Sequence, residues 1–234
     1  MPAAPPPLLP MLRERLRQVA DPARAPGMQA YMKSAMPYLG VSAVPLRKIC
    51  RELFAGLEWS NARSWRIDVL SLWRGAEFRE ERYAAIELSG VRAALPYHTL
   101  SSLPMYEEMV VTGAWWDYVD AIATQRLWTM AEYVGPAMDL AMLAWSSDAD
   151  MWKRRAAILH QIKAGARTDP ELLFRCIEPS LGSKEFFLNK AIGWALRQYA
   201  RTDPDEVRHY VARNAASLSP LSRREALKHI GGAA

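Results

Sequence analysis

The sequence predicts an all-α fold of stacked helical hairpins, and three observations support that class. Apolar residues recur at steps of three and four along most of the 234-residue chain, which is the spacing of one helical face. Only 12 residues are glycine, and strand-like alternation is weak. Helix-start signals recur at a regular interval, which indicates a repeated unit.

Apolar spacing predicts three helices most clearly. In chain order they are EFREERYAAIELSGVRAAL (77–95), DMWKRRAAILHQIKAG (150–165) and FFLNKAIGWALRQYA (186–200). The motif Thr-Asp-Pro occurs at 168–170 and again at 202–204, 34 residues later. Asp169 and Asp203 can each cap a helix whose first residue is proline, where the missing N–H costs nothing.

A period near 35 residues emerges when five short segments are aligned. Their first residues are separated by 37, 35, 35 and 35 positions. Each has a polar or amphipathic residue followed by alanine, and small residues let helices approach closely. Two helices per 35 residues predict a curved solenoid with a concave face. The segments begin at Tyr83, Asp120, Arg155, Lys190 and Glu225.

Domain organisation and location follow from composition. Half of the residues are hydrophobic, which fits one large domain, and no apolar run reaches the roughly 18 residues of a membrane span. We expect residues 1–7, rich in proline, to be a flexible lead-in, and residues 8–234 to form a single helical repeat domain. Two cysteines without a C-x-x-C motif favour the cytoplasm, and four scattered histidines argue against a metal site.

Charge is unevenly distributed along the chain. Residues 1–150 hold 15 Lys/Arg against 17 Asp/Glu, whereas residues 151–234 hold 15 against 8. A basic C-terminal third indicates a polyanionic partner, most commonly nucleic acid. A solvated basic surface without a partner is an equally good interpretation of charge alone.

The stretch AWWDYVDAIA (114–123) places aromatic and acidic residues together in a predicted helix. Asp120 shares a repeat phase with Arg155 and Lys190, and residues at that phase are expected to face solvent. Trp116 lies four residues before Asp120, and Trp194 lies four residues after Lys190, so each shares the face of its neighbour. These five side chains are therefore expected to converge on one surface.

Structural interpretations of the same residues remain open. Core packing is the alternative for Trp116 and Trp194, since most of the nine tryptophans are expected to pack in the core, Trp115 and Trp152 in particular. Asp120 could serve only as a salt-bridge partner for Arg155, and the Arg-Arg pairs at 154–155 and 223–224 could be solvated rather than bound to phosphate.

An aspartate between aromatic rings on a basic surface suits a cationic group carried on a nucleic acid. Aromatic faces attract cations, and lysine and arginine bind the phosphate backbone. An N-alkylated purine carries a positive charge and a weakened glycosidic bond. A carboxylate beside its sugar would stabilise the oxocarbenium-like transition state, as in glycoside hydrolysis.

The chain resembles the DNA alkylation repair enzymes of the AlkD type, which are DNA glycosylases built from HEAT-like repeats. The resemblance extends from about residue 9 to residue 231. The motifs that carry it are YMKSAMPYLGV (31–41), REERYAAIEL (79–88), WWDYVD (115–120), WKRRAAIL (152–159), SKEFFLNKAIGWALRQYA (183–200) and LSPLSRREALKHI (218–230).

The resemblance implies excision of positively charged N3- and N7-alkylated purines from double-stranded DNA by a glycosylase, without metal or cofactor. No lysine is placed as a Schiff-base nucleophile, so we expect a monofunctional enzyme that leaves the strand uncut. It implies that Asp120 is the catalytic carboxylate, that Trp116 and Trp194 contact the lesion, and that Arg155 orients Asp120 and touches the DNA backbone. The sequence departs from the family at Tyr118, which we expect to narrow the cleft, and at Asn189, which removes a possible phosphate contact.

The expected fold is therefore a HEAT-like helical-hairpin solenoid with a concave DNA-binding cleft, and the expected state is a monomer. A non-catalytic solenoid that binds DNA structures or a protein partner is the alternative. Further residues predicted to contact the DNA backbone are Arg154, Lys190, Arg197, Arg223 and Arg224.

Overall fold

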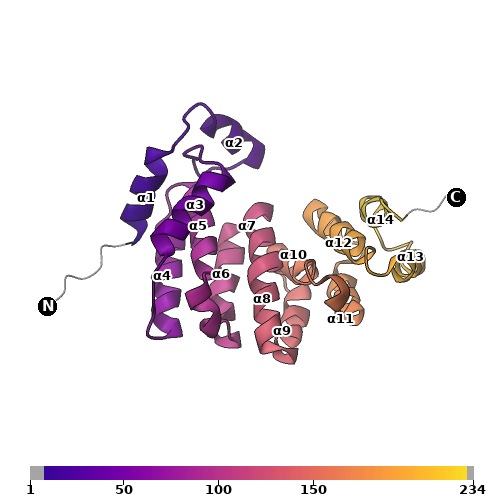
Figure 1. The fold of residues 1–234 in the computed structure, drawn as a ribbon. Helices are drawn as coiled ribbons and strands as arrows, with labels where there is room; N and C mark the ends of the chain where they lie inside the picture. Colours follow the sequence, from indigo (N-terminus) through magenta and orange to yellow (C-terminus); the bar gives the residue numbers. More distant parts are fainter. Residues whose placement is uncertain (1–7, 231–234) are drawn as a thin grey trace. The chain divides into compact units, whose positions relative to one another are not determined.

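The computed structural model describes residues 8–230, and these are helical with no strand among them (Figure 1). The predicted lead-in at 1–7 lies outside the described residues. The chain divides into two compact units, Met1–Tyr97 and His98–Ala234. Within the described part, no helix is both long and apolar enough to span a bilayer.

The first unit contains five α-helices and one 3₁₀ turn. They are α1 (Leu8–Gln18), α2 (Ala25–Met32), α3 (Ala43–Phe54), α4 (Ala62–Arg74), α5 (Arg79–Ser89) and η1 (Arg92–Tyr97). Helix α5 packs against both α3 and α4, and α1 packs across the same group. The core of this unit includes Leu12, Trp65 and Trp73, each almost fully buried.

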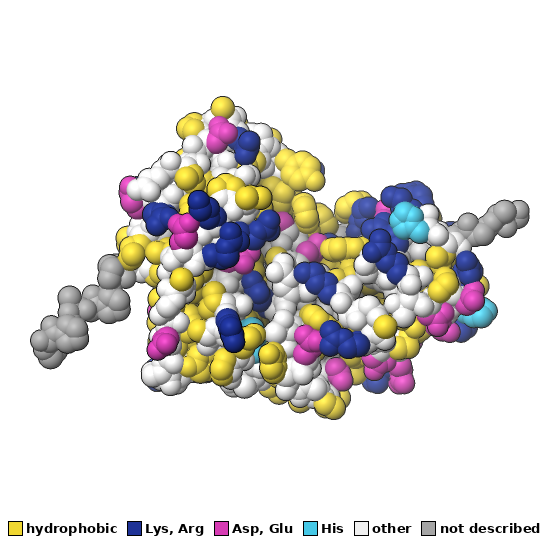
Figure 2. Space-filling view, viewed as in Figure 1, with side chains coloured by type: hydrophobic (Ala, Val, Ile, Leu, Met, Phe, Trp, Pro, Cys, Tyr) yellow, Lys and Arg dark blue, Asp and Glu magenta, His cyan; other side chains and the backbone are white. Residues whose placement is uncertain are grey.

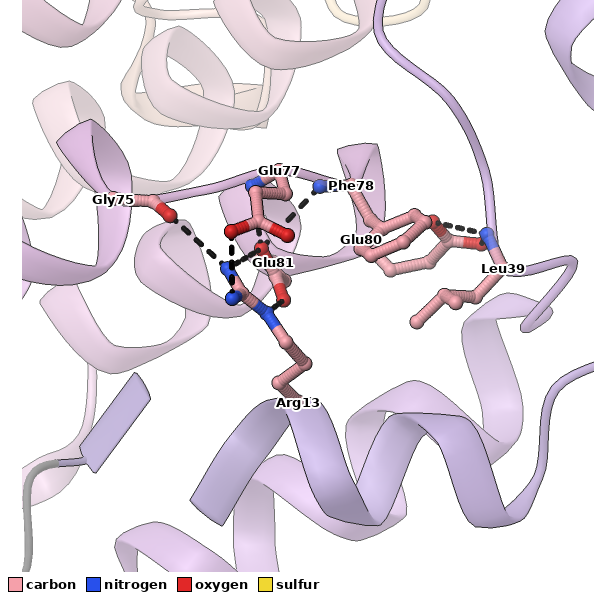
Figure 3. A network of polar contacts seen from close by, with 7 residues as sticks. All are labelled: Arg13, Leu39, Gly75, Glu77, Phe78, Glu80 and Glu81. Carbon is pink, nitrogen blue, oxygen red and sulfur yellow. Dashed lines mark hydrogen bonds and ion pairs between the residues drawn. The ribbon is translucent and has the colours of Figure 1, made fainter. Parts of the chain in front are cut away.

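A polar network ties α1 and a loop to the start of α5 (Figure 3). Arg13 of α1 binds Glu81 and Glu77, at 2.5 and 2.8 Å. The buried Glu80 carboxylate accepts backbone N–H bonds from Leu39, Gly40 and Val41. Gly40 has φ +84° there, and a Cβ would come within 2.0 Å of the Asp21 carbonyl oxygen, so this turn requires glycine.

The second unit carries the repeat. Its elements are η2 (Leu100–Ser102), α6 (Leu103–Gly113), α7 (Trp116–Ala121), a π-helical turn η3 (Ile122–Leu127), α8 (Trp128–Val134), α9 (Pro136–Ser146), α10 (Met151–Leu159), η4 (Gly165–Arg167), α11 (Pro170–Ile177), η5 (Glu178–Ser180), α12 (Phe186–Tyr199), α13 (Pro204–Arg213) and α14 (Pro220–Ala226).

Helix starts in this unit recur at the predicted period. One set begins at residues 116, 151, 186 and 220, steps of 35, 35 and 34. The other set begins at Pro136, Pro170 and Pro204, steps of 34. In the first set, α10 packs against α7 and α12, and α12 packs against α14. The all-α, helical-hairpin repeat predicted from the sequence is confirmed in this unit.

The two Thr-Asp-Pro motifs form the predicted helix starts. The Asp169 carboxylate accepts from the Leu172 N–H at 3.1 Å, and the Asp203 carboxylate accepts from the Glu206 N–H at 2.9 Å. Pro170 and Pro204 are the first residues of α11 and α13. Both caps satisfy an N–H group that the helix leaves unpaired.

Candidate active site

The candidate site is built around Asp120, which lies on helix α7. The turn before it passes through Ala114, whose φ of 34° lies in the left-handed region, and α7 begins two residues later. Trp116 is half-buried, and it lies one helical turn before Asp120 on the same face. The π-helical turn Ile122–Leu127 begins two residues after Asp120, and such turns often mark functional sites.

Arg155 of α10 holds the Asp120 carboxylate through two parallel hydrogen bonds. Its Nε donates to Asp120 Oδ1 and its Nη2 donates to Oδ2, both at 2.7 Å. Its Nη1 donates to the backbone carbonyl oxygen of Phe187 on α12. Helices α7, α10 and α12, which are the equivalent helices of three neighbouring repeats, thus meet at one guanidinium. The paired hydrogen bonds fix the orientation of the carboxylate.

Burial differs between the two partners of this ion pair. The Arg155 side chain is 5% exposed, whereas the Asp120 side chain is 14% exposed. The carboxylate can therefore be reached from solvent while the guanidinium lies behind it. Burial raises the pKa of Asp120 above its usual range, and the hydrogen bonds and charge of Arg155 oppose that rise.

One expectation about Arg155 is corrected by this geometry. We expected its side chain to face solvent. It is buried, and its nitrogen atoms are engaged by Asp120 and Phe187. The reason is that a buried charge must be paired, and here the pairing with Asp120 holds the guanidinium inside the protein.

An aromatic cluster covers the ion pair on one side. The rings of Trp115, Trp152 and Phe187 lie with centroids 5.1 to 6.1 Å apart. The Arg155 guanidinium carbon lies 5.9 Å from the centre of the Phe187 ring. Trp152 is buried, as predicted, and Trp115 is half-buried. The cluster removes water from one side of the charges, which strengthens their interaction.

Phe187 was not singled out from the sequence, although the period could have found it. It lies 35 residues after Trp152, so it occupies the equivalent position in the next repeat. Rings at equivalent positions of neighbouring repeats stack against each other, and the observed centroid distance is 5.1 Å.

A second charge cluster lies on α12 and α14. The Glu225 carboxylate binds Lys190 through Oε1 at 3.0 Å and Arg197 through Oε2. Trp194 lies between these two cations in the sequence of α12 and is half-buried. Lys190 and Glu225 are 35 residues apart, like Asp120 and Arg155, so both pairs join equivalent positions of neighbouring repeats.

The remaining predicted DNA-binding arginines lie elsewhere in this unit. Arg223 and Arg224 line a groove between α13 and α14, together with Arg208, rather than joining the α12 cluster. Arg154 is half-buried, and its Nε has no hydrogen-bond partner. Its charge contributes to the low pKa of Asp148, whose main cause is the hydrogen bond from Lys153.

The two departures from the family have structural consequences. Tyr118 is fully buried, so it does not narrow a cleft as we expected. It lies on the opposite side of α7 from Trp116 and Asp120, which accounts for its burial. Asn189 is also buried, and its amide donates to the Ser183 carbonyl oxygen at 3.0 Å.

Other titratable groups near α10 are engaged in ion pairs. The Lys153 ammonium binds Glu107 at 2.6 Å and Asp148 at 2.5 Å. Burial lowers its pKa, but these partners outweigh burial and the net shift is upward. Among residues 8–230, no group of three or more His, Cys, Asp or Glu is placed to hold a metal ion.

Comparison with known proteins identifies the fold and the family. The chain is similar to a solved structure described as a predicted DNA alkylation repair enzyme from Enterococcus faecalis, with 27% sequence identity and a TM-score of 0.82. The similarity covers 92% of this chain and 98% of the other. No curated protein matches the chain. The sequence profile of the DNA alkylation repair enzyme family matches residues 12–230, and the chain therefore belongs to that family.

Proposed function

We propose that this protein is a monofunctional DNA glycosylase that excises positively charged N3- and N7-alkylated purines from double-stranded DNA. It would act as a monomer in base excision repair. DNA would lie against the side of the second unit that carries Asp120 on α7 and the charged cluster on α12. The reaction needs no cofactor, because the lesion itself supplies a good leaving group.

The observation that carries this proposal is the environment of Asp120. A single carboxylate is held by two hydrogen bonds from Arg155, yet part of it remains open to solvent. Each carboxylate oxygen keeps a lone pair that Arg155 does not use. A carboxylate that is oriented and partly desolvated interacts strongly with a positive charge placed beside it.

The chemistry follows from where charge moves. As the bond between the sugar C1′ and the purine nitrogen breaks, the electron pair leaves with the base, which becomes neutral. Positive charge then develops on the sugar, and Asp120 stabilises it. Water oxygen forms the new bond to C1′, and its proton passes to Asp120 or to solvent. The products are an abasic site and the free alkylpurine.

Trp116 and Trp194 are proposed to recognise the lesion. Both are half-buried, so each exposes part of its indole. An indole face attracts a cationic ring by about 0.5–2 kcal/mol, depending on desolvation. This preference favours the alkylated purine over the normal base, since the normal base carries no charge.

The lysines of α10 and α12 favour simple hydrolysis over strand cleavage. Strand cleavage through a Schiff base needs a neutral amine that can reach the sugar. Lys153 is buried between two carboxylates with a raised pKa, and Lys190 is paired with Glu225. Each amine is bound to a carboxylate, which disfavours its attack on the sugar.

Base release from matched duplexes tests the proposal. The wild-type protein is expected to release 7-methylguanine and 3-methyladenine from duplexes that carry one lesion, and to leave the strand uncut. A duplex with hypoxanthine, which is a neutral damaged purine, is expected to react at least roughly 100-fold more slowly, since its leaving group lacks the positive charge.

Two outcomes would contradict the proposal in different ways. Equal rates for cationic and neutral purines would reject the electrostatic basis of selection. DNA binding without release of any base would favour the alternative, a non-catalytic solenoid that binds DNA structures. Absence of salt-sensitive DNA binding would instead favour a protein partner, because phosphate contacts weaken steeply with salt.

A further inference from the structure

Helix α12 presents a basic and aromatic stripe. Lys190, Trp194 and Arg197 follow one another at steps of four and three, so they lie on one face of the helix. The Lys190 and Arg197 side chains are 41% and 23% exposed. On the side shown in Figure 2, Lys and Arg side chains gather over α14 and the adjoining part of α12.

One carboxylate binds both cations of this stripe. Glu225 reaches across from α14, and each of its oxygens accepts from a different cation. Its side chain is 16% exposed, so the carboxylate sits between the cations rather than out in solvent. Two oxygens that carry a negative charge and bridge a lysine and an arginine present the same contacts as the two non-bridging oxygens of a phosphodiester.

We propose that Lys190 and Arg197 form a binding site for one DNA phosphate beside Trp194, and that the Glu225 carboxylate occupies this site in the free protein. The inference rests on the proposed function in that the ligand is DNA. Binding exchanges the carboxylate for a phosphate, which places the nucleotide next to the indole. Glu225 thereby lowers affinity for DNA in general and leaves recognition of the lesion to the aromatic residues.

The packing of α12 on α14 confines this exchange to the side chain of Glu225. A Cβ on Gly193 would meet the Glu225 Cβ at 2.5 Å, so the two helices touch at this point. The Ser222 hydroxyl donates to the Asn189 carbonyl oxygen at 2.9 Å and fixes α14 one turn away. The Glu225 backbone is held, so the proposed exchange would proceed by rotation of its side chain away from the cations.

The charge of Glu225 persists at neutral pH. The hydrogen bond from Lys190 is the largest cause of its lowered pKa, and the charges of Lys190 and Arg197 add to it. DNA must therefore displace an ionised carboxylate rather than a neutral acid. Removing that charge is expected to make a full phosphate contact available.

The test compares two neutralising substitutions in the full chain. Glu225→Gln and Glu206→Gln each raise the net charge by one. Glu206 pairs with Arg213 on α13, away from the α12 stripe. Affinity for an undamaged duplex is measured by fluorescence anisotropy between about 50 and 300 mM salt. Glu225→Gln is expected to bind about 3- to 10-fold more tightly than Glu206→Gln, with a salt slope steeper by about 1.

A double substitution shows whether the gained affinity depends on Lys190 rather than on a change in structure. Lys190→Gln is expected to weaken binding only slightly in the wild-type background, where Glu225 already neutralises the site. In the Glu225→Gln background the same change is expected to remove the gained affinity and restore the lower slope. Thermal unfolding curves of the four proteins confirm that each is folded.

The inference is overturned if Glu225→Gln binds no more tightly than Glu206→Gln, or if Lys190→Gln has the same effect in both backgrounds. Because the duplex is undamaged, neither result depends on catalysis. Failure of the proposed glycosylase activity would appear separately, as absence of base release by a wild-type protein that still binds DNA.

Discussion

Arg155 controls the protonation of Asp120 as well as its direction. Burial raises the pKa of this carboxyl, and Arg155 holds the rise in check. The proposed mechanism requires the ionised form. Activity should therefore fall as the pH drops through the pKa of Asp120. Because burial raises that pKa, the fall should occur at a higher pH than for an ordinary aspartate.

Replacing Arg155 by methionine is expected to move the acid limb of base release to higher pH by at least about one unit. The substitution removes two hydrogen bonds and a positive charge that favour the carboxylate. Arg155→Lys keeps the positive charge but not the two parallel hydrogen bonds. The acid limb of this variant should therefore lie between those of the wild type and Arg155→Met. Rates of base release are measured from pH 4 to 8 under single-turnover conditions. If the normalised pH profiles of the wild type and the variants coincide, Arg155 does not have this role.

His160 makes stability depend on pH. It is fully buried, and burial lowers its pKa from 6.5 to about 4. The unfolded chain takes up a proton as the pH falls below 6.5, whereas the folded chain does so only near 4. The stability present above pH 6.5 is therefore lost over this interval, by roughly 3 kcal/mol in total.

His160→Gln is expected to flatten the fall in unfolding free energy between pH 6.5 and 4. The control is His209→Gln, because His209 is exposed on α13 and should leave the slope as in the wild type. Urea unfolding at several pH values measures both. Equal slopes for the three proteins would show that His160 does not cause the dependence.

The close approach of α12 and α14 positions both Glu225 and the α12 stripe. Gly193 permits it, since an added Cβ would lie 2.5 Å from Glu225 Cβ and 3.0 Å from the Ser222 carbonyl oxygen. The same region carries the hydrogen bond between Ser222 and Asn189. A side chain at position 193 must push the two helices apart.

Gly193→Ala is expected to lower the free energy of unfolding by about 1–3 kcal/mol through overpacking. It should also weaken the effect of Glu225 on DNA binding. Gly27→Ala in α2 is the matched control, because a Cβ there meets nothing within 4 Å and alanine favours the helix. A Gly193→Ala protein as stable as the control would show that α14 can move away at little cost.

Sequence spacing was sufficient for some of these elements and not for others. The 35-residue period indicated the pair of Asp120 and Arg155, because equivalent positions of neighbouring repeats lie side by side. Lys190 and Glu225 are separated by the same interval and also form an ion pair, although we did not predict that pair. The period could not place Arg197 on Glu225, which are 28 residues apart. That contact depends on the length of the arginine side chain, which the repeat period does not describe.

The two units of the molecule divide the net charge differently from the sequence ranges 1–150 and 151–234. The unit Met1–Tyr97 holds 14 Lys/Arg and 9 Asp/Glu, whereas His98–Ala234 holds 16 of each. The basic residues after position 150 are thus balanced by acidic residues within the same unit. The proposed affinity of that unit for DNA must therefore arise from local arrangement, such as the cations on α12, rather than from net charge.

The site of the proposed chemistry lies within one unit of the fold. The site is built from the equivalent helices of three neighbouring repeats, which carry Asp120, Arg155 and Phe187. The period that stacks the helices therefore also assembles the site. The sequence could predict this alignment, but it could not predict that Arg155 would be buried. The Phe187 ring lies beside the guanidinium, and Trp152 packs against that ring.

The rate of 7-methylguanine release by Asp120→Asn tests the central claim most directly. We predict a loss of about 100- to 1,000-fold relative to wild type under single-turnover conditions, with DNA affinity changed less than about threefold. Asp117→Asn, one turn earlier on α7, should retain most of the wild-type rate. An Asp120→Asn protein that releases the base at the wild-type rate would contradict the account.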